Sequence, residues 1–157
     1  MKATEKEITQ RLQKALREQP CFGTVAEERI REAETTLGVS FPRSYRVFLK
    51  SFGASYGLAG CVLSGLPLTR RWDSAPPEFS NVIDDTELAR KACGEHLPHE
   101  YVAISSDGCD CQFYLDTSRT DATEECLVIA LGPGRDTDVA AASFLEFVEK
   151  LASGVDP

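Results

Sequence analysis

The order of the hydrophobic patterns along the chain constrains the fold more than any other feature. Apolar residues recur at helical spacing up to about residue 52 and again from residue 143. Between these regions lie short runs rich in Val, Ile, Tyr and Phe, separated by turn-forming residues. Helical and strand patterns do not alternate, so the sequence predicts an α+β fold. We expect an antiparallel sheet flanked by N-terminal helices and a C-terminal helix.

Local signals predict where the N-terminal helices begin. Thr4 and Thr24 are each followed three residues later by Glu7 and Glu27, a spacing typical of a capping box. Pro42 suits the first turn of a third helix, where its missing N–H has no helical partner. The apolar stripes expected to face the core contain Ile8, Leu12, Ala15, Leu16, Ile30, Ala33, Leu37, Tyr45, Phe48, Leu49 and Phe52.

The remainder of the chain is expected to form the sheet and two further helices. Glycines interrupt the apolar residues of 56–68, which favours a strand or hairpin there. The other predicted elements are a loop at 72–80, a short helix at 84–92, strands at 101–105, 112–116 and 126–131, a turn at 132–134 and a helix from Ser143 that buries Phe144, Phe147, Val148 and Leu151.

Length and composition predict one domain spanning residues 1–157, with a loose tail at 153–157. The apolar run at 127–131 is far too short to cross a bilayer, and the first seven residues are too charged for a signal peptide. We therefore expect a cytoplasmic protein without a membrane span, present as a monomer or a weak homodimer.

Six cysteines in a reducing compartment are expected to be free thiols. Cys109 and Cys111 form the one close pair, and this pair lacks the second pair that a tetrahedral zinc site requires. His96 and His99 lie in a predicted loop, too far along the chain to complete such a site. We expect no metal and no cofactor.

The charge is distributed unevenly between the two parts of the chain. Residues 1–72 contain twelve Lys and Arg against seven Asp and Glu, whereas residues 73–157 contain five against eighteen. An anionic segment repels nucleic-acid phosphates and attracts a basic protein. The charge therefore argues against direct nucleic-acid binding. The alternative for any individual acidic residue is that it only keeps the surface soluble.

Four short segments of the chain match, in order, those of a known family: a helix pair, a strand, a Gly-x-Asp turn with the strand after it, and a C-terminal helix. The positions concerned are Glu27, Ile30, Glu34, Leu37, Gly38, Phe41, Pro42, Tyr45, Phe48, Leu49, Gly53, Val102, Ala103, Ile104, Gly108, Asp110, Tyr114, Leu115, Asp116, Ser143, Phe144 and Phe147. Over about residues 24–151 the chain resembles the SUKH superfamily, the Smi/Knr-like group. Two departures affect binding details more than the fold: Cys111 and Gln112 precede Phe113, and Phe52-Gly53 replaces a frequent Asn-Gly.

The resemblance implies a protein-binding domain, most often the immunity protein that neutralises a bacterial toxin. Many such toxins are nucleases, whose phosphate-binding groove is basic, so an acidic antidote would complement it. The alternative is a regulatory or scaffold adaptor that binds another protein. No arrangement of nucleophile, base and orienting group is recognisable in the sequence, so we do not expect an enzyme.

The residues predicted to contact the partner combine one aromatic residue with four carboxylates. Trp is over-represented in interface hot spots, although burial at the edge of the core is an equal alternative for the single Trp of this chain. The predicted contact residues are Trp72, Asp84, Asp85, Asp107 and Asp110.

Overall fold

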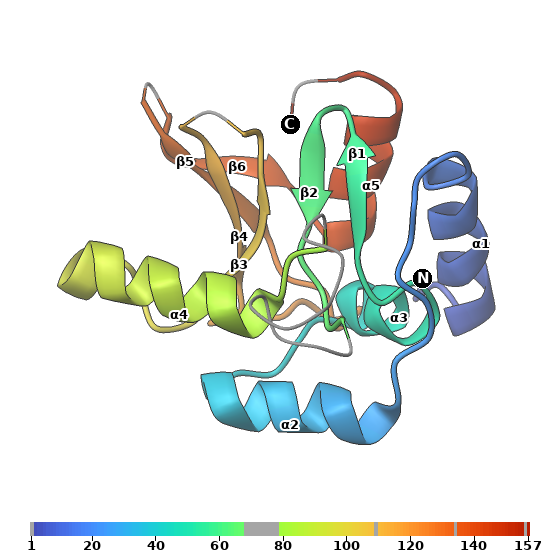
Figure 1. Ribbon diagram of the computed structural model, residues 1–157, viewed down its shortest axis with the longest axis horizontal. Helices are drawn as coiled ribbons and strands as arrows, with labels where there is room; N and C mark the ends of the chain where they lie inside the picture. Colours follow the sequence, from blue (N-terminus) through green and yellow to red (C-terminus); the bar gives the residue numbers. More distant parts are fainter. Residues whose placement is uncertain (1, 68–78, 109, 134, 156) are drawn as a thin grey trace.

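The computed structural model describes residues 2–67, 79–108, 110–133, 135–155 and 157, and for residues 135 and 136 the backbone alone. A six-stranded antiparallel sheet forms the centre of the molecule (Figure 1). Helices α1, α3 and α5 lie to its right in this view, and α4 crosses its lower left. The predicted α+β class, with N-terminal helices and a C-terminal helix around an antiparallel sheet, is confirmed.

The helices begin and end close to the predicted positions. The Thr4 capping box is confirmed, since the Glu7 N–H donates to Thr4 Oγ1 at 3.1 Å and the Thr4 N–H donates to Glu7 at 2.7 Å. Asn81 caps the helix predicted at 84–92 and so extends it by two residues at its start. The helices are α1 Glu5–Ala15, α2 Glu27–Leu37, α3 Arg43–Ser51, α4 Val82–Cys93, the 3₁₀ turn η1 Gly94–His96, and α5 Phe144–Ala152.

The predicted capping role of Thr24 is wrong. The N-cap of α2 is Ala26, which makes no side-chain capping hydrogen bond. The backbone before it is bound elsewhere: the Gly23 N–H donates to the Phe52 carbonyl at 2.8 Å, and the Val25 N–H donates to the Lys50 carbonyl at 3.2 Å. This extended segment runs along the end of α3, so α2 begins only after it.

The strands follow one another in the sheet in the order of the sequence, each antiparallel to the next. The last strand was not predicted. Its sequence is rich in Asp and poor in β-branched residues, a composition that an edge strand tolerates because one side of it remains in water. The strands are β1 Ser55–Leu58, β2 Cys61–Leu63, β3 Tyr101–Ser106, β4 Gln112–Asp116, β5 Val128–Gly132 and β6 Arg135–Ala141.

The main core lies between one face of the sheet and helices α1, α3 and α5. Tyr45 and Phe48 of α3 contact the ring of Phe144 from α5, with centroid distances of 4.9 and 5.1 Å. All three side chains are fully buried. The predicted core stripes of the helices are confirmed, except that Ala15 and Phe52 are only partly buried.

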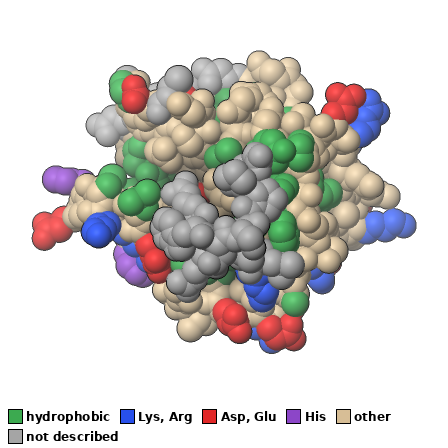
Figure 2. Space-filling view, viewed as in Figure 1, with side chains coloured by type: hydrophobic (Ala, Val, Ile, Leu, Met, Phe, Trp, Pro, Cys, Tyr) green, Lys and Arg blue, Asp and Glu red, His purple; other side chains and the backbone are tan. Residues whose placement is uncertain are grey.

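Among the described residues, the second face of the sheet is covered by fewer helices. Helix α4 packs against β3 there, and a small cluster forms around Leu97, Ala103 and Tyr114. Hydrophobic side chains remain visible on the surface along α4, at the left of Figure 2. Within the described residues, no helix is long and apolar enough to span a membrane.

Candidate functional site

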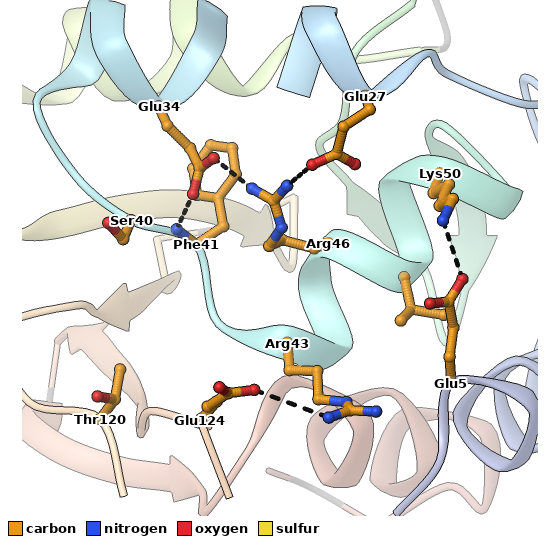
Figure 3. Close-up of a pocket in the computed structure, with 11 residues that line it drawn as sticks. Glu5, Glu27, Glu34, Ser40, Phe41, Arg43, Arg46, Lys50, Thr120 and Glu124 are labelled. Carbon is orange, nitrogen blue, oxygen red and sulfur yellow. Dashed lines mark hydrogen bonds and ion pairs between the residues drawn. The ribbon is translucent and has the colours of Figure 1, made fainter. Parts of the chain in front are cut away.

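Helix α3 presents a row of three cations to a cavity of about 720 Å³ (Figure 3). Arg43, Arg46 and Lys50 follow one another at spacings of three and four residues, which places them on one side of the helix. The cavity is bounded by α2, α3, the start of α1, and Thr120 and Glu124. Buried Phe41 and Val47 contribute to its lining.

Each of these cations contacts a glutamate from a different part of the chain. Arg46 forms ion pairs with two residues of α2, Glu27 and Glu34. Lys50 Nζ lies 3.1 Å from Glu5 at the start of α1, and Arg43 lies 3.7 Å from Glu124. The row therefore joins α3 to three neighbouring segments, and its charges are already matched within the protein.

Glu34 also accepts a hydrogen bond from the Phe41 N–H at 2.7 Å. This carboxylate thus fixes the connection between α2 and α3 as well as Arg46. Glu34 is one of the positions that support the family resemblance, and its contacts show a structural role. We therefore do not take this cavity as the partner-binding site.

Two acidic residues of the C-terminal part also serve the fold. Glu125 accepts hydrogen bonds from the N–H and Oγ of Ser44, at 2.9 and 2.7 Å, and Ser44 Oγ accepts one from the Leu145 N–H at 3.2 Å. One carboxylate thereby stabilises the first turns of α3 and α5. Burial raises the pKa of Glu125. Glu124 pairs with Lys2 and Arg43, as described for the cavity.

Part of the negative charge after residue 72 is matched by cations of the N-terminal part. Glu124 and Glu149 form ion pairs with cations of that region, Lys2, Arg43 and Arg11. The other ion pairs of the described residues lie within the N-terminal part itself. The ion-paired cations of the described N-terminal part are divided equally: Arg31, Arg46 and Lys50 bind N-terminal glutamates, and Lys2, Arg11 and Arg43 bind Glu124 or Glu149.

Asp84 and Asp85 lie in the first turn of α4, where the helix dipole favours negative charge. Asp85 accepts a hydrogen bond from Ser64 Oγ at 2.7 Å. Asp84 Oδ2 is buried and has no hydrogen-bond partner among the described residues. Both side chains are half-buried.

Asp107 and Asp110 lie in the exposed connection between β3 and β4. They line a cavity of about 510 Å³ together with Cys61, Cys111 and Phe113. Figure 1 shows this connection at the upper end of the sheet, whereas α4 crosses the lower end. The structure therefore places the four predicted aspartates in two separate regions. Trp72 lies outside the described residues.

A groove that the sequence analysis did not identify lies between α4 and the second face of the sheet. Its volume is about 390 Å³. Helix α4 contributes residues at helical spacing, among them Leu88, whose side chain is 57% exposed. The main lining residues are Asp85, Leu88, Ala89, Ala92 and Cys93 of α4, and Val62, Ser64, Ala103, Ser105, Gln112 and Tyr114 of the sheet region.

The described residues contain no group of three His, Cys, Asp or Glu side chains that could hold a metal ion. His96 and His99 are exposed. Cys111 is partly buried and lines the cavity of Asp107 and Asp110, and Cys109 lies outside the described residues.

Comparison with known proteins identifies the family. The model of the SMI1/KNR4 family (SUKH-1) matches residues 24–150, which include every helix and strand from α2 to β6 and most of α5. Helix α1 lies before the matched region. A comparison with curated proteins gave no match. The match covers well over half of the chain, and this protein belongs to the SMI1/KNR4 (SUKH-1) family, whose members are typically immunity proteins of polymorphic toxin systems.

Proposed function

We propose that this protein is a non-enzymatic immunity protein that acts in the cytoplasm and neutralises a cognate toxin by covering a basic surface on it. Family membership supports the class of function, since members are generally non-catalytic immunity proteins. A nuclease, with its basic groove for phosphates, is the kind of toxin that best complements an acidic antidote.

The distribution of charge carries the proposal. Residues 73–157 contain eighteen Asp and Glu against five Lys and Arg, and of the described ones Glu124 and Glu149 form ion pairs with N-terminal cations. Charges of this kind accelerate encounter with an oppositely charged protein. We retain Trp72, Asp84, Asp85, Asp107 and Asp110 as candidate contacts. Glu87 joins them because it is exposed on α4, three residues after Asp84.

Growth of cells that express the toxin tests the proposal. The protein is co-expressed with the product of the adjacent gene, and we expect the wild type to restore growth. The double variant Glu87→Lys with Asp110→Lys should lose this protection, because it places one cation on α4 and another in the β3–β4 connection, both at exposed positions. We leave Asp85 unchanged in this experiment, since its hydrogen bond with Ser64 supports the fold.

The matched control is Glu28→Lys with Glu32→Lys, which makes the same charge change at exposed positions of α2. This control should protect as well as the wild type does. If the wild type fails to protect, the proposed function is wrong for this gene pair. If the wild type and both double variants protect equally, the toxin is bound through another surface.

A further inference from the structure

Strand β6 forms one edge of the sheet, and among the described residues β5 is its only neighbour in the sheet. Thr137, Asp138 and Val139 are all exposed, although successive side chains of a strand point to opposite faces. An edge strand carries backbone N–H and C=O groups to which a strand of another chain can bind. Two copies of a protein can join their sheets in this way unless the edge itself prevents it.

The backbone of β6 is interrupted at two positions. Thr137 has a φ of 58°, a left-handed conformation that is uncommon for a β-branched residue. The register skips Ala140, since its neighbours Val139 and Ala141 pair with consecutive residues of β5. Ala140 is thus the extra residue of a β-bulge, a feature that bends a strand and disrupts its ladder. Only residues 138 and 139 lie between the two interruptions, which is shorter than strands usually are.

Helix α5 supplies a cation at the second interruption. Lys150 Nζ donates a hydrogen bond to the Ala140 carbonyl oxygen at 2.9 Å, and Lys150 is half-buried. About one turn earlier in α5, Glu146 accepts a hydrogen bond from the Ala142 N–H, directly after the strand. Side chains of α5 therefore bind two backbone groups at the end of β6.

A strand of a second copy would meet these charges at the edge. Pairing beside Ala140 would either bury the Lys150 ammonium or displace it from the carbonyl, and burial of a charge without a new partner is unfavourable. In an antiparallel pair of two β6 strands centred on residue 138, the Asp138 carboxylates of the two copies would also face each other. Like charges directly opposite destabilise a strand pair.

We propose that β6 and Lys150 form a protected edge that keeps this protein monomeric. The left-handed residue and the bulge shorten the backbone that a second copy could pair with. Lys150 and Asp138 place charges beside the short stretch that remains. The inference goes beyond the proposed function and does not depend on it, because it concerns the association of the protein with itself.

The test removes both charges and measures the mass of the protein in solution. In the double variant Asp138→Thr with Lys150→Met, threonine favours strand pairing, and methionine is an unbranched side chain without the charge. Sedimentation equilibrium should give 17.2 kDa for the wild type at every protein concentration. The average mass of the double variant should rise with concentration to that of a dimer or more.

The matched control is Asp110→Thr with Lys91→Met, which makes the same substitutions at exposed positions away from β6. This control should remain monomeric. Hydrogen exchange locates the contact, since the amides of residues 137–141 in the double variant should exchange more slowly at high than at low protein concentration. A double variant that stays monomeric, or slowed exchange confined to other strands, would overturn the proposal. Association of the wild type through β6 would overturn it equally.

Folding of the double variant is checked by circular dichroism, because Lys150→Met leaves the Ala140 carbonyl without this donor. If the double variant is unfolded, Asp138→Thr alone takes its place, since Asp138 is exposed. The single variant should also associate, at higher protein concentration than the double variant would. A monomeric mass for the single variant at every concentration would then count against the protected edge.

Discussion

Replacement of Gly65 by alanine is expected to destabilise the protein by about 3 kcal/mol or more, the upper range for overpacking of an interior. A Cβ atom at this position would lie 1.7 Å from the Gly53 carbonyl oxygen and 2.9 Å from Ala54 Cα. Both contacts are with backbone, which cannot move aside as a flexible side chain can. Chemical denaturation monitored by circular dichroism measures the loss.

The position of Gly65 connects this prediction to the proposed site. The Gly65 N–H donates to the Ser80 carbonyl at 2.9 Å, and its own carbonyl accepts from the Val82 N–H at 2.8 Å. Gly65 thus holds the start of α4 beside the end of α3. Gly60→Ala is the control: open space surrounds that position, so the substitution should cost only the left-handed backbone strain of about 1 kcal/mol. Equal losses for both variants would refute the close-contact explanation.

Tyr45→Ala is expected to cost about 4 kcal/mol, as truncation of a buried aromatic side chain does. Tyr45 is fully buried, and its ring lies edge-on to Phe41 and Phe144 at centroid distances of 5.1 and 4.9 Å. Removal of the ring would leave a cavity among α3, α5 and the connection before α3. The free energy of unfolding from denaturant titration gives the measured value.

Tyr45→Phe separates the contribution of the hydroxyl group from that of the ring. The hydroxyl donates to the Ser64 carbonyl at 2.6 Å, so the phenylalanine variant should lose about 1 kcal/mol. If Tyr45→Phe proves as destabilising as Tyr45→Ala, the hydrogen bond and not ring packing dominates, and the estimate for the cavity is wrong.

These contacts give a physical reason for one of the family positions. Tyr45 binds the backbone of Ser64, and the Ser64 hydroxyl binds Asp85 in the first turn of α4. The buried core is therefore connected through two hydrogen bonds to the helix that forms the groove wall. A tyrosine at this position supports the placement of α4 as well as the packing of α3.

The helical part of the fold was predictable from local patterns. The Thr4 capping box, Gly38 in a left-handed conformation and Ser143 as the cap of α5 act through neighbouring residues, so the sequence indicates them directly. The start of α2 was not predictable in this way, because the bond of Val25 to α3 is made between distant segments. Strand β6 was missed because its pairing with β5 outweighs its weak strand composition.

The candidate site was predictable only in part. The position of Asp84 and Asp85 at a helix start followed from charge and helix polarity. The groove depends on which face of β4 meets α4, a matter of strand register that no local pattern specifies. Leu88 belongs to an apolar stripe that would ordinarily indicate the core, and only the structure shows that this side chain is mostly exposed.

The salt dependence of toxin association tests the central claim most directly. Association rates of the wild type with the product of the adjacent gene are measured by stopped flow across a range of ionic strength. If the carboxylates after residue 72 guide a basic partner, the rate should fall at least about tenfold between about 0.05 and 0.5 M salt, and Glu87→Lys with Asp110→Lys should remove most of this dependence. A rate that is independent of salt and equal in both proteins would contradict an acidic contact surface.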